Sequence, residues 1–265
     1  MPITRHTQSV RDAYDELAAT YDQDFTESVI GRLQRDALWR RFEGLFERGQ
    51  QLLDLGCGTG EDALYFAQQG ISVHGIDVSP AMIEIAGRRT VQEERISVET
   101  LSVECVTRVA GGPYDGAFSS FGPLNCVHDL AALARDLAEL IRPGGIAALC
   151  LMKRLCLWET VLYPLTAALH RKGAAEEAWS DKPAEDGDFR VFYPPVREVR
   201  RHFAPWFEFV VAPGVGLFLP PAYLEPSAAR HTLITAALSR ADRAVAHWPG
   251  LRALAENRLV VFRRR

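Results

Sequence analysis

Three glycines at alternate positions, Gly56, Gly58 and Gly60, follow a short apolar strand pattern and precede a helical pattern. Glycine lets a ligand approach the backbone closely, and the start of a helix places further N–H groups beside it. The GxGxG spacing is one residue shorter than the dinucleotide fingerprint GxGxxG. Glu61 and Asp62 add negative charge at the helix start, which disfavours a pyrophosphate more than a zwitterionic amino acid tail.

Two aspartates flank this loop. Asp54 lies at the end of the strand before the glycines, and Asp77 ends the second strand pattern. From that position a carboxylate can accept hydrogen bonds from both hydroxyls of a ribose. Taken alone, Asp77 is more often a helix-capping residue. The glycine loop and the strand-end acid, on consecutive strand–helix units, together predict a nucleoside ligand.

The elements that would position these residues alternate between strand and helix patterns. The strand patterns cover residues 51–55, 71–76, 95–101, 114–120, 146–152, 207–211 and 259–262. This rhythm predicts an α/β fold with a doubly wound, Rossmann-like, mostly parallel seven-stranded sheet that has helices on both faces. Two helices between residues 10 and 46 precede the first strand.

We expect a single domain over residues 1–265. Its parts would be N-terminal cap helices (1–50), a nucleoside-binding core (51–152), a lid or substrate-side insertion (153–206), and C-terminal strands with a helix (207–265). Within the insertion, residues 155–170 have a long apolar helix pattern and residues 189–193 could form a short strand.

Composition limits the possible partners and the compartment. The net charge of −4 gives no electrostatic footprint for a nucleic acid, and the arginines at positions 263–265 are expected to be a solvated tail. Five cysteines, an odd number without CxxC spacing, favour reduced thiols in the cytoplasm. We expect no signal peptide, no membrane segment and no metal site; the oligomeric state stays open.

Two segments resemble the motifs of a known family. Residues 52–60, Leu-Leu-Asp-Leu-Gly-Cys-Gly-Thr-Gly, resemble motif I of the class I S-adenosylmethionine (SAM)-dependent methyltransferases, and residues 75–83, Gly-Ile-Asp-Val-Ser-Pro-Ala-Met-Ile, resemble their second motif. Residues 142–145, Arg-Pro-Gly-Gly, match the turn before their fifth strand. The resemblance covers residues 10–152 and implies that SAM is the cofactor and S-adenosylhomocysteine the product.

The resemblance also implies roles for single residues. Gly56 and Gly58 would approach the methionine part of SAM, Asp77 would hold the ribose, and Val78 with Met82 would sandwich the adenine. The expected cofactor-binding set is Tyr14, Tyr21, Asp54, Gly56, Cys57, Gly58, Asp77, Val78, Met82, Ser102, Glu104, Ser119 and Phe121.

Two parts of that set have alternative interpretations. The family's usual Gly-Asp pair after the third strand is absent, so Ser102, which lies at the expected position, and Glu104 are the candidates for the contact with the adenine amino group. Tyr14 and Tyr21 resemble an N-terminal segment that closes over SAM, but they could equally form an aromatic stripe packed on the sheet, since their spacing keeps both rings on one helix face.

The methyl acceptor should bind beyond the end of the fourth strand, near residues 119–129. This segment contains neither the Asp/Asn-Pro-Pro-aromatic tetrad of nucleic-acid and glutamine amino methyltransferases nor a Pro-Cys nucleophile. The candidate catalytic residues are His128, Asn125 and Glu159. His128 could instead be a surface or capping residue, Asn125 could simply bond the loop backbone, and Glu159 could hold an amine or act as a base.

Aromatic residues after position 155 suit a lipophilic or aromatic acceptor, although they could form the lid's own small core; they include Trp158, Tyr163, Trp179, Tyr193, Phe218 and Tyr223. The leading hypothesis is a SAM-dependent methyltransferase that acts on an O, N or C atom of a small metabolite, in specialised metabolism. The alternatives are a non-catalytic SAM-binding regulator or scaffold, and a protein or RNA methyltransferase.

Overall fold

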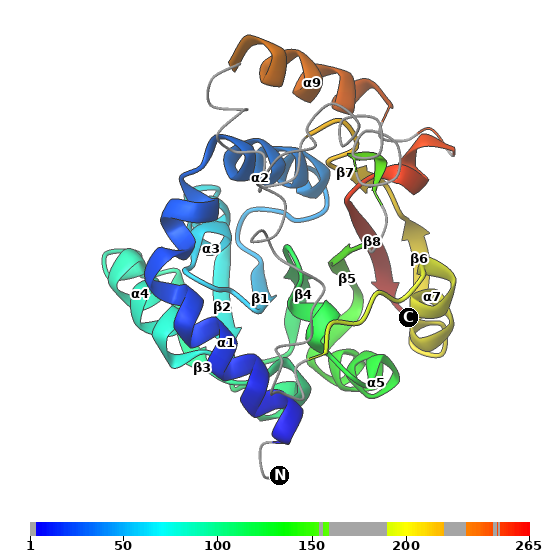
Figure 1. Cartoon of the computed structure of the whole chain (residues 1–265). Helices are drawn as coiled ribbons and strands as arrows, with labels where there is room; N and C mark the ends of the chain where they lie inside the picture. Colours follow the sequence, from blue (N-terminus) through cyan, green and yellow to red (C-terminus); the bar gives the residue numbers. More distant parts are fainter. Residues whose placement is uncertain (1–3, 154–155, 159–189, 220–231, 246–247, 249) are drawn as a thin grey trace.

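The structure is a computed structural model that describes residues 4–153, 156–158, 190–219, 232–245, 248 and 250–265 (Figure 1). Its centre is a sheet with the strand order β3-β2-β1-β4-β5-β8-β6. The strands are β1 (Gln51–Leu55), β2 (Ser72–Asp77), β3 (Ile96–Thr100), β4 (Tyr114–Ser119), β5 (Ile141–Met152), β6 (Phe207–Val211) and β8 (Asn257–Arg264). The two-residue β7 (Gly214–Val215) pairs with β8 as an eighth strand.

Strands β1 to β5 are parallel, whereas β8 runs antiparallel to both β5 and β6. The expected doubly wound, mostly parallel sheet is therefore confirmed, with the two-residue strand as an addition. Strand β5 begins at Ile141, earlier than predicted, because Ile141 pairs with Tyr114 before a shift in register.

Several of the main helices begin at a capping side chain. They are α1 (Arg5–Tyr21), α2 (Val29–Phe42), α3 (Glu61–Gln68), α4 (Pro80–Thr90), α5 (Leu130–Leu140), α7 (Val196–Phe203) and α9 (Thr232–Val245). Thr4, Ser28 and Ser79 accept backbone N–H groups at the starts of α1, α2 and α4. A π-helix, Asp22–Thr26, connects α1 to α2.

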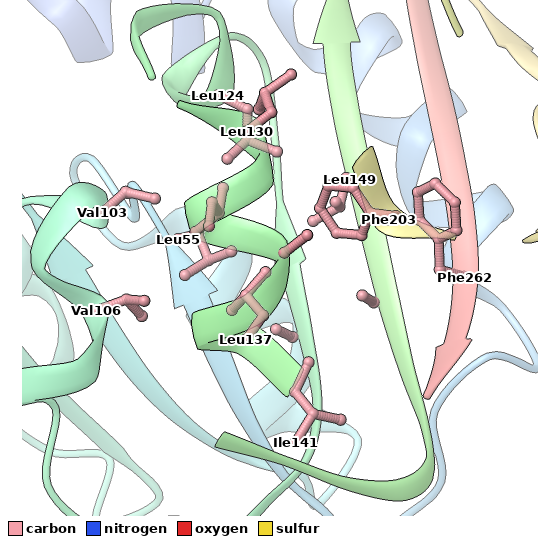
Figure 2. Packing of buried hydrophobic residues seen from close by; sticks show 14 of the residues in the cluster. Leu55, Val103, Val106, Leu124, Leu130, Leu137, Ile141, Leu149, Phe203 and Phe262 are labelled. Atoms are coloured by element: carbon pink, nitrogen blue, oxygen red, sulfur yellow. The ribbon is translucent and has the colours of Figure 1, made fainter. Parts of the chain in front are cut away.

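Each face of the sheet is covered by its own apolar core. On one face α5 and α7 pack against the sheet, and Figure 2 shows Leu137 of α5 and Phe203 of α7 in that layer, near Leu149 and Phe262. On the other face α2 and α3 contribute Phe42 and Phe66. These two layers hold the strand ends in fixed positions, which is what a ligand site at the edge of a sheet requires.

Two expectations about the second half of the chain are wrong. Residues 190–193 form no strand, because the backbone of Phe192 bonds to Asn125 instead. The arginines at positions 263–265 are not a free tail: β8 runs to Arg264, whose guanidinium donates to the carbonyls of Ala138 and Trp206, and the N–H of Arg265 also donates to Trp206.

The expected lid helix at 155–170 and most of the insertion lie outside the described residues, together with Glu159, Tyr163, Trp179 and Tyr223. Within the described part of the chain, no helix combines the length and apolarity needed to cross a bilayer.

Candidate functional site

A pocket lies beyond the carboxyl ends of β1, β2, β3 and β4. Of the expected cofactor-binding residues, it brings together Tyr14, Tyr21, Gly56, Cys57, Gly58, Asp77, Val78, Met82, Ser102, Glu104 and Phe121. Segments far apart in the sequence meet here: α1, the glycine loop, the end of β2, and the loops after β3 and β4.

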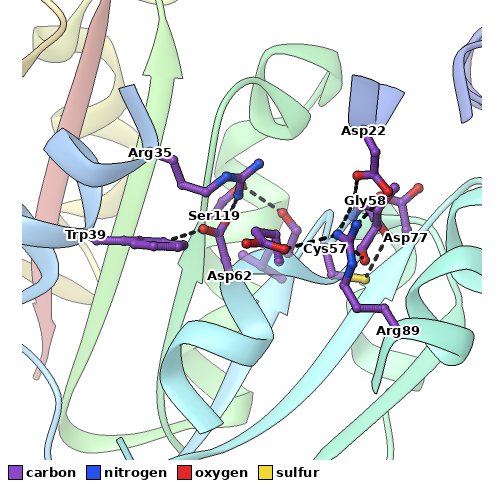
Figure 3. Close-up of polar contacts among 12 residues, drawn as sticks. Asp22, Arg35, Trp39, Cys57, Gly58, Asp62, Asp77, Arg89 and Ser119 are labelled. Atoms are coloured by element: carbon purple, nitrogen blue, oxygen red, sulfur yellow. Dashed lines mark hydrogen bonds and ion pairs between the residues drawn. The ribbon is translucent and has the colours of Figure 1, made fainter. Parts of the chain in front are cut away.

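Asp77 links the end of β2 to the glycine loop. One carboxylate oxygen accepts the N–H of Gly58 at 2.9 Å (Figure 3), and the other accepts the N–H of Ser79 at 2.9 Å. Burial raises the pKa of Asp77 to about 6, although the N–H groups of Ser79 and Gly58 oppose this shift. Since each oxygen has a second lone pair, the carboxylate can still accept bonds from a ligand.

The glycine loop needs glycine at Gly56 and Gly58. At Gly56 φ is +82°, and an added Cβ would lie 2.3 Å from the side chain of Pro123. At Gly58 φ is +51°, and an added Cβ would meet no atom of the described chain within 4 Å, because this residue borders the pocket. The pocket therefore offers an open backbone surface, which fits a ligand that approaches this loop closely.

Two of the expected cofactor-binding residues do not line the pocket. Ser119 is fully buried and donates its hydroxyl to the carbonyl of Leu55, which ties β4 to β1. Asp54 is 1% exposed behind the glycine loop. Burial, with the nearby Asp62 and Asp77, raises the pKa of Asp54 well above its usual value. The pocket is lined instead by the next residue of the β4 loop, Ser120.

Tyr14 and Tyr21 both face the pocket from α1. Burial raises the pKa of each phenol, so both stay protonated at neutral pH and can donate a hydrogen bond. Tyr21 also contacts Phe25, with 5.8 Å between ring centroids. The two rings thus border the space available to a ligand rather than packing flat on the sheet.

Helix α1 lies along α4 (Figure 1) and is held there by polar contacts. Asp15 accepts the Ser79 hydroxyl at 2.5 Å and the Ala81 N–H at 3.1 Å, so an α1 side chain caps the start of α4. At the other end of α1, Asp22 accepts the Thr59 hydroxyl at 2.7 Å and pairs with Arg89 at 2.5 Å (Figure 3).

Arg35 is a pocket residue that sequence reasoning missed. It reaches the pocket from α2 and pairs with Asp62 at 2.7 Å, while Trp39 donates to the same carboxylate at 2.6 Å (Figure 3). Its guanidinium lies 5.5 Å from the ring centroid of Phe25 and 5.6 Å from that of Phe121. Among the described residues that line the pocket, Arg35 carries the only full positive charge.

Ser102 and Glu104 border the pocket at the start of the 3-10 helix Val103–Arg108. The Ser102 hydroxyl accepts the N–H of Glu104 as a helix cap. The carboxylate of Glu104 accepts the Thr7 hydroxyl at 2.8 Å and the His128 N–H at 3.2 Å. Glu104 therefore joins the start of α1 to the loop before α5 and also borders the pocket.

Two of the three candidate catalytic residues are described, and neither lines the pocket. Asn125 is fully buried, and its amide bonds to the backbone of Met152 and Phe192, which supports the role in loop bonding over substrate orientation. His128 is exposed and contacts the Phe192 ring edge-on, as expected of a surface residue. Glu159 lies outside the described residues.

A doubly wound sheet with a glycine loop and a strand-end carboxylate defines a nucleoside-binding α/β domain. A family model described as a methyltransferase domain matches residues 52–145. The chain is 30% identical over 155 residues to a demethylmenaquinone methyltransferase of Tropheryma whipplei (strain Twist), covering 55% of this chain and 60% of that protein.

Two other relatives match about half of the chain or less. A malonyl-[acyl-carrier protein] O-methyltransferase of Serratia marcescens is 31% identical over 144 residues, with 54% of this chain and 52% of that protein covered. A protein named S-adenosyl-L-methionine-dependent Diels-Alderase, from Talaromyces variabilis, is 32% identical over 111 residues, with 40% of this chain and 37% of that protein covered. The chain thus matches at most about three fifths of the length of these relatives.

A solved structure of a SAM-dependent methyltransferase from Mesorhizobium loti has the same fold, with a TM-score of 0.54, 20% identity, and coverage of 86% of this chain and 98% of that one. Over about half of its length the chain is thus similar to SAM-dependent methyltransferases, and these matches imply SAM as the cofactor. Within the described part of the chain, no cluster of three or more His, Cys, Asp or Glu side chains could hold a metal ion.

Proposed function

We propose that this protein transfers the methyl group of SAM to an O, N or C atom of a small, aromatic or lipophilic metabolite. The observation that carries the proposal is the pocket in which the glycine loop, Asp77, Val78 and Met82 converge. The names of two relatives, which specify demethylmenaquinone and malonyl-[acyl-carrier protein], support a small or carrier-bound acceptor group.

The pocket has the groups needed to hold SAM. Asp77 would accept the ribose hydroxyls, and the apolar side chains of Val78 and Met82 would pack against the adenine. Ser102 and Glu104 border the pocket where the adenine amino group would find an acceptor. When bound, SAM supplies a methyl group on a sulfonium that is a good leaving group.

The amino acid tail of SAM also needs a cation for its carboxylate. Arg35 is the candidate, because it is the one cationic side chain among the described pocket residues and its Nε finds no partner among them. Asp62 fixes the guanidinium from one side, and Phe25 and Phe121 flank it. This arrangement leaves Arg35 oriented before a ligand arrives.

The acceptor would bind near Ser120 and Phe121, beyond the end of β4. The Ser120 hydroxyl is buried without a hydrogen-bond partner in the described structure, so it can donate to an acceptor oxygen or nitrogen. Phe121 and Tyr14 would exclude water from the transfer point. Alignment and desolvation then supply much of the rate, and a base is needed only if the acceptor must lose a proton. Glu159 stays a prediction for that base.

A second candidate is a SAM-dependent protein that uses the same fold without methyl transfer. Neither His128 nor Asn125 provides a base in the described pocket, and one relative is named as a Diels-Alderase. In such a protein the ligand pocket would order a substrate while the sulfonium remains unreacted.

The test is incubation of the purified protein with methyl-labelled SAM and a cell extract, separated into small-molecule, protein and RNA fractions. We expect label in the small-molecule fraction, and much less with Asp77→Ala. Label in protein or RNA would reject the small-molecule acceptor. If SAM binds but no fraction is labelled, the second candidate is favoured. We place this activity in the cytoplasm and in specialised metabolism.

A further inference from the structure

A second hollow lies between α7 and the strands β6 and β8, where the C-terminal end lies beside α7 in Figure 1. Four arginines line it, three of them from one stripe of α7: Arg197, Arg200, Arg201 and Arg265. Its other lining residues are Ala204, Phe207, Phe209 and Phe262. The hollow therefore combines phenyl rings with several guanidinium groups.

The positive charges in this hollow are not balanced within the described chain. Arg197, Arg201 and Arg265 form no ion pair there, and Arg200 instead lies over the Phe209 ring at 4.0 Å from its centroid. No acidic side chain is among the described residues that line the hollow, and the Arg265 oxygen accepts instead from Arg264 at 3.2 Å. This concentration of cations contrasts with a whole-chain net charge of −4.

The acidic side chains of the neighbouring helices and strand do not face the hollow. Glu198 of α7 approaches His202 at 3.8 Å. Glu208 alternates along β6 with Phe207 and Phe209, so its side chain lies on the other face of the sheet. On α5, Asp136 pairs with Arg135 at 2.8 Å. Like charges held together without counterions favour the binding of an anion.

The hollow is built from ordered parts. The Arg265 N–H donates to the Trp206 carbonyl at 3.1 Å, which fixes the backbone of this residue beside α7. Phe207 and Phe262 are buried in the core, so the base of the hollow cannot collapse without loss of packing. Stacking on Phe209 orients the Arg200 guanidinium.

The hollow is separate from the SAM pocket. Arg265 follows the end of β8, which is antiparallel to β5, and Phe207 starts β6, which pairs with that same end of β8. Both residues therefore lie at the end of the sheet where β5 begins. The SAM pocket lies at the opposite end, where β1, β2 and β4 finish. A ligand here would not occupy the methyl-transfer site.

We propose that this hollow binds a small soluble molecule that carries a phosphate or diphosphate group. Guanidinium groups bind phosphate oxygens through paired, charge-assisted hydrogen bonds, and several arginines around one centre can bind several oxygens at once. The buried rings of Phe207 and Phe262 form the floor of the hollow, and Phe209 carries the Arg200 guanidinium above it. The proposal does not depend on the methyl-transfer activity.

An anionic membrane is a different kind of partner for the same charges. Trp206, just before β6, and Val210 of β6 are 38% and 44% exposed nearby. Glu208, between them in sequence, is exposed as well, and its carboxylate opposes contact with anionic lipid. A concave site fits a small molecule better than a flat lipid surface.

The test is calorimetric titration of the full chain with inorganic diphosphate, inorganic phosphate and phenyl phosphate at low ionic strength. We expect saturable binding of diphosphate, and weaker binding of inorganic phosphate and phenyl phosphate, which each carry fewer charged oxygens. The double variant Arg197→Gln/Arg201→Gln should weaken diphosphate binding by about tenfold or more, because two charge-assisted contacts are lost. Arg88→Gln, an exposed arginine of α4, is the matched control and should bind as the wild type does.

The same titrations contain the results that would overturn the proposal. They are an absence of saturable binding to the wild type, or equal binding by the double variant when its thermal unfolding matches that of the wild type. A third contradicting result combines two observations: the protein floats with phosphatidylglycerol-containing vesicles, and it binds none of the soluble phosphates. That result would assign the surface to a membrane. Binding of S-adenosylhomocysteine, measured on the same samples, stays unchanged if only this site is altered.

Discussion

Asp77 connects the glycine loop to the ligand, and its protonation should control cofactor binding. Because burial raises its pKa to about 6, a large fraction of the ligand-free protein carries a neutral Asp77 at mildly acidic pH. Ribose hydroxyls donate to the ionised form, so SAM affinity should rise with pH through this value.

Calorimetric titration with S-adenosylhomocysteine (SAH) should therefore give binding about tenfold weaker at pH 5 than at pH 7.5, and Asp77→Asn should remove most of this difference. Without a ligand, the raised pKa of Asp77 has the opposite effect on the stability of the fold. The neutral Asp77 favours the folded state below the usual aspartate pKa, and this stabilisation is lost as pH rises through about 6. A pH-independent affinity in the wild type would argue against a carboxylate–ribose contact.

Arg35 gives a second test at this scale, because only ligands with a carboxylate can use it. We expect Arg35→Lys to weaken SAH binding by about tenfold, since the planar guanidinium is replaced by a point charge. Binding of 5′-methylthioadenosine, which lacks the amino acid tail, should change little. If both ligands lose affinity equally, Arg35 supports the pocket only through its buried pair with Asp62.

At the level of elements, α1 should act as a cover whose attachment determines how long the cofactor stays bound. Arg89 joins α4 to the π-helix and the glycine loop through Asp22 and Thr59. Arg89→Met should increase the SAH dissociation rate by about tenfold, because a partly buried charge pair is lost, and should increase hydrogen exchange in α1.

The neighbouring Arg88 provides the control, since it is exposed and pairs only within α4, with Glu84. Arg88→Met should leave both quantities unchanged. Equal dissociation rates in the two variants would show that the contacts of Arg89 do not hold α1 over the pocket.

The packing of α7 on the sheet depends on Phe203, whose ring stacks on Phe262 with 4.6 Å between centroids. Phe203→Ala should lower the free energy of unfolding by about 3 to 5 kcal/mol, because the substitution leaves a cavity in a fully buried position. Val91→Ala, at a position 78% exposed, should change it by less than about 0.5 kcal/mol. Urea unfolding measures both, and a similar loss in the two variants would contradict this account of the core.

How much could be predicted from the sequence differs between these scales. The glycines and Asp77 could be predicted because strand, turn and helix follow one another within a short stretch of the chain. The strands β1 to β4 are short segments, each with apolar residues, between turn or helix signals. The role of Arg35 in the pocket could not be predicted, because its position in the α2 sequence is like that of any surface arginine. Only the tertiary fold brings it beside Asp62. Asn125 was ambiguous for the same reason, since its partners Met152 and Phe192 are distant in sequence.

For the whole molecule, sequence patterns do not predict the order in which the last strands pair in the sheet. The pairing of β8 between β5 and β6 converts an apparent arginine tail into one wall of a hollow whose other arginines come from α7. Net charge could not reveal that hollow, because it averages over the chain. The two sites at opposite edges of one sheet give the domain a cofactor pocket and an independent anion-binding surface.

The central claim is that the glycine loop and Asp77 form a SAM site, and equilibrium binding tests it most directly. Calorimetric titration of the wild type and of Asp77→Ala should show SAH binding that the substitution weakens by about 10- to 150-fold, the equivalent of about 1.5 to 3 kcal/mol for a hydrogen bond to a charged group. NAD should not bind to either protein. Binding of NAD in place of SAH, or equal SAH affinity in the two proteins, would contradict the account.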